Sequence, residues 1–462
     1  MLLEQYAQLA ERVFSHTGSR RESRQRLTTH ALALPTTQGR RTISRMLCSL
    51  ERQQQDWSAD YKLFSRSPWS CEDLFDPVID EWLGRYPRGA IAAALDETKL
   101  RRTGKKIPGA QWLRDPLSPA FHANLMWGER RLHVSLLFPH YREHGGQAVP
   151  CRAVPLRFEQ TPHVKKPGKA ASEPEQQAYR RARKQHNLST YAVDGVRQVR
   201  ERINQRGGRQ RPLVLAGDGS FCNRTVFRCE IAGVIWLSRT RKDARLSFPA
   251  PAGARRTYGT AFTPDEVRHS DFVPYRSTKI FHGGQWRAVR FKEVPDVLWQ
   301  RGAARRRLRL LVVAPTPYKT STHSRTQYHQ AAYLLCTDTH EVDAEQLLQI
   351  YFDRWQIEVN HREIKDVFGV GDAQVRAKQS VPRHPAFAVA CYSLLLIAAM
   401  QVFGPAWNPM LFPLPCWRTK LPARPSAFDL LTRLRHEIHE TRDSRYDLDQ
   451  IARNLGRWIN LP

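Results

Sequence analysis

The chain has 462 residues, of which 41% are hydrophobic and 10% aromatic, including 12 Trp. This size excludes a single small binding module, and the aromatic content excludes a disordered basic tail, which lacks the apolar area needed to offset chain entropy. The 73 Lys and Arg against 44 Asp and Glu give a formal net charge of +29, so a polyanion is the expected partner.

The first 85 residues have the pattern of helices, because apolar residues recur every three to four positions in stretches such as 42–50 and 74–83. We expect residues 1–85 to form a helical N-terminal DNA-binding region, although no helix-turn-helix can be identified. No secretory signal follows Met1, and the eight cysteines have no zinc-ligand spacing. These features predict reduced thiols in a bacterial cytoplasm.

Residues 86–240 have the strand and helix alternation of an α/β core. Two short apolar runs are typical of strands buried on both faces: Ala90–Leu95, which stops at Asp96, and Leu213–Ala216, which stops at Asp218. Further strands are predicted at 121–127, 132–138, 149–158 and 233–237, with a basic helical stretch at 173–206 and a short helix from Asn223.

Residues 241–330 interrupt the core pattern with prolines, glycines and alternating stretches, including a hairpin around Gly283-Gly284, so we expect a β-rich basic insertion. The second part of the core, 331–405, begins with a strand at 332–336 and continues as a long helix from Asp343 toward Gly369. The apolar stretch 386–400 is too short to span a bilayer and predicts a buried helix with no membrane role. Residues 406–462 predict a helical C-terminal region with two short amphipathic helices.

The positive charge is concentrated in two of these segments. Residues 162–211 hold 13 Lys and Arg against 4 Asp and Glu, and residues 241–330 hold 18 against 6. These 140 residues therefore carry +21 of the net charge. A single basic run is usually only a solvated face, but two such segments flanking apolar strands favour a phosphate-binding groove.

The helix near residue 355 carries the most informative pattern. At about 100° per residue, Tyr351, Arg354, Glu358 and Lys365 share one narrow stripe. Ile357, Ile364 and Phe368 fall on another side and predict the core-facing surface, while Trp355 and Arg362 lie close to the polar stripe. The simplest alternative is a surface pair of Arg354 and Glu358. A carboxylate among Tyr, Arg, Lys and Trp suits metal-bound phosphate better than a plain solvent face, and Trp can stack on an unpaired base.

The spacing Tyr-x2-Arg-x3-Glu-x6-Lys resembles the signature of transposases of the insertion-sequence 4 superfamily and its insertion-sequence 701-like relatives. The stretch Gly369–Arg376 and the region from Asp96 to Ser118 are also similar to that family. The resemblance covers about 90–240 and 331–400. It implies a DDE transposase with an RNase H-like mixed-sheet α/β catalytic core, a β-rich insertion and helical N- and C-terminal regions.

The family's chemistry needs two aspartates and one glutamate around two divalent ions, and Asp96, Asp218 and Glu358 match those places. Carboxylate oxygens suit Mg²⁺ or Mn²⁺. Independently of the family, aspartates that end buried strands lie where α/β folds place their sites, although Asp218-Gly219-Ser220 alone is more typical of a turn. Glu97 is the rival to Asp96, but a strand neighbour faces the opposite way and suits a supporting role.

The resemblance implies that Tyr351, Arg354, Trp355, Arg362 and Lys365 contact DNA, with Trp286 or Trp299 as further stacking candidates. The implied partners are double-stranded DNA, both the terminal inverted repeats and the target, and a second copy in a homodimer. Two alternatives stay open: a metal-dependent endonuclease without strand transfer, and a catalytically inactive DNA-binding protein derived from a transposase.

Overall fold

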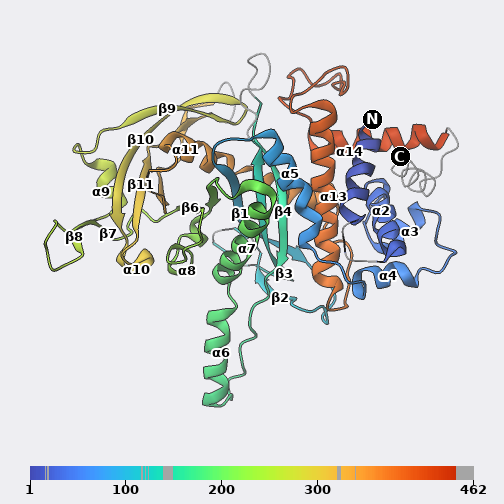
Figure 1. Ribbon diagram of the computed structural model, residues 1–462, viewed down its shortest axis with the longest axis horizontal. Coiled ribbons are helices and arrows are strands. Elements are labelled where there is room, and N and C mark those ends of the chain that lie inside the picture. The colour runs from blue at the N-terminus through green and yellow to red at the C-terminus, as the bar shows by residue number, and fades with distance from the viewer. Residues whose placement is uncertain are drawn as a thin grey trace.

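The computed structural model describes residues 1–15, 17, 20–115, 118–119, 121–122, 124–138, 149–319, 324–338 and 340–443. Its centre is a large mixed sheet with helices on both faces (Figure 1). Strands from the whole middle of the chain join this sheet in the order β2-β3-β1-β5-β6-β14-β11-β10-β7-β8, with β4 on β3 and β9 on β10. A large mixed α/β sheet agrees with the fold expected of a DDE transposase.

The sheet is parallel only at its centre, where β1 pairs with β5 and β5 with β6. The other pairs in the sheet are antiparallel, among them β1 with β3 and β14 with β6. The strands of the first half are β1 (Ile91–Arg101), β2 (Gln111–Arg114), β3 (Leu125–Phe138), β4 (Arg152–Gln160), β5 (Leu213–Gly217) and β6 (Val234–Arg239).

The predicted insertion contributes strands to this same sheet, because β11 pairs with β14 and β10 pairs with β11. The predicted hairpin at Gly283-Gly284 is confirmed, with His282 opposite Gln285. The strands of the second half are β7 (Leu246–Pro249), β8 (Tyr258–Phe262), β9 (Arg276–His282), β10 (Gln285–Leu298), β11 (Arg307–Val313) and β14 (Ala332–Cys336); β12 (Pro317–Tyr318) and β13 (Gln327–Tyr328) form a separate two-stranded ribbon.

Helices cluster at the two ends of the chain and between the strands. The first group is α1 (Leu2–Ser15), α2 (Arg21–Thr36), α3 (Ile43–Ser49), α4 (Ser58–Ser65), the 3-10 turn η1 (Glu72–Phe75) and α5 (Asp76–Arg85). The second group is α6 (Glu173–Gln185), α7 (Leu188–Ile203), the π-turn η2 (Asn204–Gly208), the 3-10 turn η3 (Gly219–Phe221), α8 (Arg224–Phe227), α9 (Pro264–His269) and α10 (Gln300–Ala303). The last group is α11 (Ala344–Asp353), α12 (Gln356–Asp366), α13 (Ser380–Phe403) and α14 (Ala427–Asp443).

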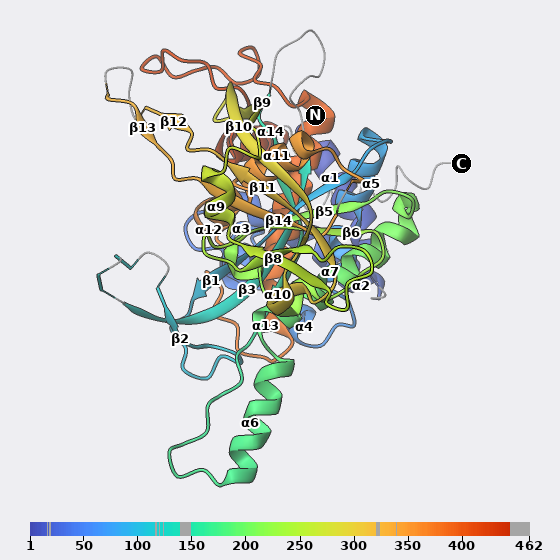
Figure 2. The same cartoon turned by 90° about the vertical axis from the view of Figure 1, so that its left-hand side faces the viewer.

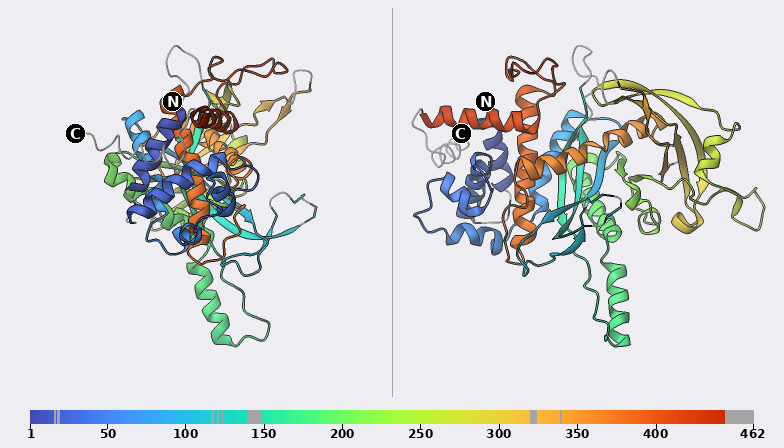
Figure 3. Two further views of the ribbon diagram at one scale, coloured as in Figure 1. Left: turned by 90° about the vertical axis from the view of Figure 1, so that its right-hand side faces the viewer. Right: turned by 180° about the vertical axis from the view of Figure 1, so that it is seen from behind.

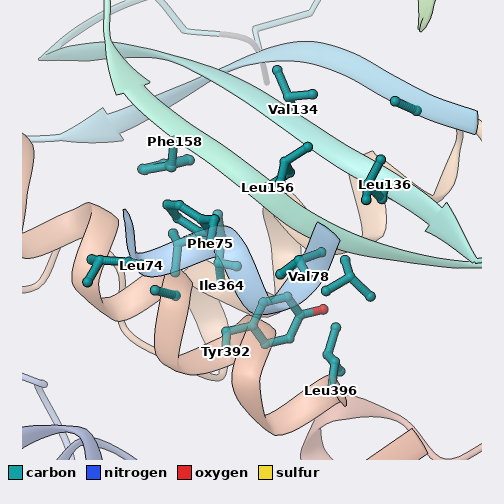
Figure 4. Packing of buried hydrophobic residues seen from close by; sticks show 14 of the residues in the cluster. Leu74, Phe75, Val78, Val134, Leu136, Leu156, Phe158, Ile364, Tyr392 and Leu396 are labelled. Carbon is teal, nitrogen blue, oxygen red and sulfur yellow. The ribbon is translucent and has the colours of Figure 1, made fainter. Parts of the chain in front are cut away.

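Alternate residues of the central strands face two different cores. Ala93 and Leu95 of β1 join the larger core, which also contains the N-terminal helices, α7 and α13. Ala92 and Ala94 join the smaller core on the other face, against Leu347 and other residues of α11. Figure 4 shows the larger core, where side chains of β3 and β4 stack over those of η1, α5, α12 and α13.

Helix α13 is the expected buried helix. By length and composition alone it could cross a membrane, but 83% of its most apolar window is buried inside the protein. It packs against α1 on one side and β4 on the other, so it joins the N-terminal helices to the sheet. Figure 3 shows α13 standing between the sheet and the helical end of the molecule.

Four predicted boundaries are wrong. The two strands expected at 121–127 and 132–138 are one strand, β3, because Glu129 forms buried ion pairs with Arg102 and Arg131 and the polar stretch therefore stays within the sheet. Strand β1 continues past Asp96 to Arg101, because its antiparallel pairing with β3 extends to Arg101, whereas its parallel pairing with β5 ends at Leu95.

The helix expected at 173–206 is interrupted before α7, where Asn187 caps the new helix by accepting hydrogen bonds from the amides of Ser189 and Thr190. The helix expected from Asp343 to Gly369 is divided into α11 and α12. The second amphipathic helix expected at the C-terminus lies outside the described residues.

Candidate active site

Two aspartates lie side by side where the parallel pairing of β1 with β5 ends. The last aligned pair of β1 and β5 is Leu95 with Gly217, so Asp96 and Asp218 follow it side by side. Both continue the alternation of Ala94 and Ala216, which belong to the core on the α11 face. The two carboxylates therefore point toward the face covered by α11.

The third carboxylate comes from the helix pair α11 and α12. Between these helices, Arg354 and Trp355 keep helical backbone angles but form a tighter turn, in which the amide of Glu358 donates to the carbonyl of Trp355 at 3.1 Å. Arg354 bridges two carboxylates: its Nη2 lies 3.3 Å from Oε1 of Glu358, and its Nη1 lies 3.8 Å from Oδ2 of Asp96.

Burial and mutual repulsion mark the three acidic groups as one cluster. Burial, together with the negative charge of Asp218, raises the pKa of Asp96 to about 7, although the nearby Arg354 opposes the shift. Burial likewise raises the pKa of Glu358, with Arg354 opposing and Asp218 adding to the rise. Such a cluster favours the binding of a cation.

Two N–H donor groups of Arg354 are available to bind a further anion. Its Nε and Nη1 atoms are buried and, among the described residues, find no hydrogen-bond partner. Tyr351 lies nearby: burial raises the pKa of its phenol, and the charges of Arg354, Asp218 and Glu358 all influence it. A guanidinium with unpaired donors beside a tyrosine hydroxyl can hold phosphate oxygens.

The remaining residues expected to contact DNA differ in their places. Lys365 is close to the cluster. Burial lowers the pKa of this lysine, and the negative charge of the nearby Asp96 partly opposes that shift. Trp355 is 52% exposed, so its indole is accessible for stacking. Arg362 is exposed, and no hydrogen bond or ion pair among the described residues joins it to the carboxylates.

Glu97 lies apart from the three carboxylates. Its oxygens are 3.9 Å from Nζ of Lys99 and 3.9 Å from Nε of Arg130, and it occupies the alternate position along β1. Trp299 packs edge-on against Phe227, as in a core contact, whereas Trp286 of β10 is 41% exposed.

Sequence reasoning missed three side chains beside the cluster. Arg239 is the last residue of β6 and follows Ser238, the partner of Gly217 in β5. Burial raises the pKa of Tyr351, and the positive charge of Arg239 opposes that rise. In the sequence, the position of Arg239 at the end of the third parallel strand could have marked it as a candidate site residue. His133 is the cross-strand partner of Asp96 and stacks near His361, with ring centroids 5.1 Å apart. Burial lowers the pKa of both imidazoles, that of His361 to about 3, so both are neutral.

A buried amide holds α12 in place. Asn360 donates to the carbonyl of Ala153 at 3.1 Å and to the hydroxyl of Tyr392 at 3.0 Å, and it accepts from Ser135 at 2.9 Å. These partners belong to the sheet and to α13. Because Asn360 is only two residues from Glu358, this network fixes the helix that carries the third carboxylate.

The donor set fits a hard divalent cation, because three carboxylates supply the oxygen ligands that such ions prefer. Within the described ranges, no three His, Cys, Asp or Glu side chains are close enough together to hold a metal ion as they stand. The guanidinium of Arg354 lies between two of the three carboxylates instead. The chemistry of the ligands therefore fits, and a closer approach of the carboxylates is needed for binding.

Comparison with known protein families gives one match, over slightly less than half of the chain. Residues 183–394 match the model of the transposase DDE domain, a range that includes Asp218, Glu358 and the whole Tyr-Arg-Glu-Lys pattern, while Asp96 precedes it. The match supports a DDE transposase, a class of enzymes that cut and transfer DNA and generally use divalent metals. A search of curated proteins finds no match.

Proposed function

We propose that the chain is a transposase of the insertion-sequence 4 superfamily, with an RNase H-like core. It binds the terminal inverted repeats of its element, cleaves phosphodiester bonds and joins 3′-hydroxyl ends to target DNA. The observation that carries the proposal is a cluster of three carboxylates, Asp96 and Asp218 from neighbouring strands and Glu358 from α12. The charge of Asp218 raises the pKa of both other acids, and Arg354 bridges Asp96 and Glu358.

In this proposal Asp96, Asp218 and Glu358 hold two Mg²⁺ or Mn²⁺ ions, which when bound activate the attacking hydroxyl and stabilise the leaving oxygen. The unpaired donors of Arg354 bind the phosphate, and Tyr351 and Lys365 orient it from either side. Trp355 stacks on a displaced base, and Arg362 binds the DNA backbone farther from the cut.

The wider assignments are part of the same proposal. Residues 1–85 bind DNA, residues 86–240 and 331–405 form the catalytic core, residues 241–330 are its basic insertion, and residues 406–462 form the C-terminal region. Two DNA ends require two copies of the chain, so the working form is a homodimer on DNA in the bacterial cytoplasm.

The test uses purified protein, Mg²⁺ and a duplex carrying the inverted repeats that flank the gene. We expect cleavage and joining by the wild type, and a loss of at least about 1,000-fold in Asp96→Asn, Asp218→Asn and Glu358→Gln, since each removes charge from the reacting site. Asp194→Asn is the matched control, because this carboxylate on α7 is 62% exposed and pairs only with Arg197 among the described residues.

Each outcome decides between the candidate functions. Cleavage without joining would indicate an endonuclease, and binding without cleavage would indicate an inactive DNA-binding protein. Full cleavage by the three carboxylate variants would overturn the assignment of the site.

A further inference from the structure

A basic arm projects from the body of the protein. We define it as residues 163–187, which leave the sheet after β4, turn back and return as helix α6 to the start of α7. No residue of α6 is buried, and Figures 1 and 2 show this helix extending well beyond the rest of the molecule. A projecting helix with no fully buried residue contributes little to folding, so the function of this helix needs another explanation.

The arm is strongly cationic and its charge is nearly unpaired. All of its Lys and Arg side chains are exposed: Lys165, Lys166, Lys169, Arg180, Arg181, Arg183 and Lys184. Its two acidic residues are Glu173 and Glu175, and the single ion pair of these cations among the described residues is a loose one, Arg180 to Glu173 at 3.8 Å. Free cations in this number suit a polyanion.

The helix of the arm has two distinct faces. Gln176, Tyr179 and Ala182 are half-buried and recur every three residues, so they lie along one side of the helix. Gln176 donates to the carbonyl of Ala171, just before the helix begins. Arg180, Arg181 and Lys184 lie on the remaining surface. The arm is thus a self-supported hairpin with an outward basic face.

A line of cations connects the arm with the carboxylate cluster. At the base of the arm, burial lowers the pKa of His163, and three nearby positive charges lower it further: Arg130, Lys99 and Arg183. Lys99 in turn acts on Lys365, which lies near Asp96. Just beyond the arm, Ser189 of α7 accepts a hydrogen bond at 2.8 Å from Asn223, which follows Asp218 by five residues.

We propose that the basic arm binds the phosphate backbone of the same DNA duplex that enters the active site, along the stretch beyond the cleavage position. This inference rests on the proposed function. Helix α6 spans about 20 Å, which corresponds to about six base pairs of duplex. The contacts are to phosphates, so the arm adds affinity without sequence preference.

The test measures duplex binding without divalent ions, by fluorescence anisotropy over a series of salt concentrations. The double variant Arg181→Gln and Lys184→Gln removes two outward cations while keeping helix propensity. Its matched control is Arg418→Gln and Lys420→Gln, an exposed Arg and Lys on the loop before α14, at the opposite end of the molecule (Figure 1). We expect the negative slope of log affinity against log salt to become shallower by about 2 in the arm variant and to stay unchanged in the control.

The outcomes separate this inference from the proposed function. If the wild type binds and cleaves DNA but the arm variant keeps the wild-type slope, the arm assignment is wrong and the proposed function stands. If the wild type binds no duplex, both fail. An arm variant that keeps its DNA affinity but loses dimers in sedimentation velocity would identify a second copy of the chain as the occupant and overturn the DNA assignment.

Discussion

A single arginine organises the candidate active site. Arg354 reaches Asp96 and Glu358 at once, so one guanidinium compensates carboxylates that come from a strand and a helix far apart in the sequence. The planar fork of arginine permits this bridge, whereas the donors of a lysine ammonium all sit on one nitrogen and cannot span the two carboxylates in the same way.

Arg354→Lys is therefore expected to lower the cleavage rate by about 10- to 100-fold, the equivalent of losing one charge-assisted hydrogen bond. The measurement is the initial rate at saturating DNA. Arg418→Lys serves as the control, because Arg418 is exposed on the loop before α14. An unchanged rate in Arg354→Lys would mean that the bridge has no part in the reaction.

At the scale of elements, the end of α11 is anchored by a carboxyl group that burial keeps protonated. Asp353 accepts a hydrogen bond from Gln349 at 3.1 Å, and the thiol of Cys151 also bonds to it. Burial raises the pKa of Asp353 to about 8, despite these hydrogen bonds and the charge of Arg424, which favour ionisation. Burial therefore keeps this carboxyl group protonated in the folded protein at neutral pH.

The sign of the resulting pH dependence follows from linkage. Between the unfolded pKa of about 3.9 and the folded pKa of about 8, the folded state keeps a proton that the unfolded state releases. The stability contributed by Asp353 is complete below that window and is lost as the pH rises through 8. Between pH 5 and pH 8.5 the free energy of unfolding should therefore decrease less in Asp353→Asn than in the wild type. The expected difference between the two proteins is on the order of a few kcal/mol.

Denaturant unfolding at pH 5 and pH 8.5 measures this difference. Asp194→Asn, an exposed carboxyl change on α7, should follow the wild type at both pH values. Parallel pH profiles for the wild type and Asp353→Asn would show that the carboxyl is ionised in the folded protein.

Local patterns predicted the elements that carry the site better than they predicted how those elements connect. Asp96 and Asp218 were recognisable because each follows a short apolar run, a signal contained within a few residues. The tightened turn at Arg354 and Trp355 was not, because neither Pro nor Gly marks it. Asn360 and Arg239 were missed since their partners lie on distant segments, and the pairing of β11 with β14 was unpredictable for the same reason.

At the scale of the whole molecule, helix α13 connects the N-terminal helices with the sheet, two regions that were predicted as separate parts of the chain. Helix α13 packs against α1 and against β4, and Leu396 is fully buried in the larger core (Figure 4). A continuous core predicts that the N-terminal helices and the sheet unfold together.

Leu396→Ala is expected to lower the free energy of unfolding by about 2–5 kcal/mol through the cavity that it leaves. Circular dichroism and tryptophan fluorescence should report one shifted transition. Leu421→Ala, at a position that is 60% exposed, should change stability little. Two separate transitions, with only one shifted, would contradict the continuous core.

The N-terminal and C-terminal helices also close on each other. The amide of Leu3 donates to the buried carboxylate of Glu437 at 2.8 Å, and α1 packs against both α13 and α14. A gene copy interrupted before α14 would leave α1 and its amide without this cover. Chains truncated before α14 would therefore be removed by proteases and would not accumulate beside the full-length protein.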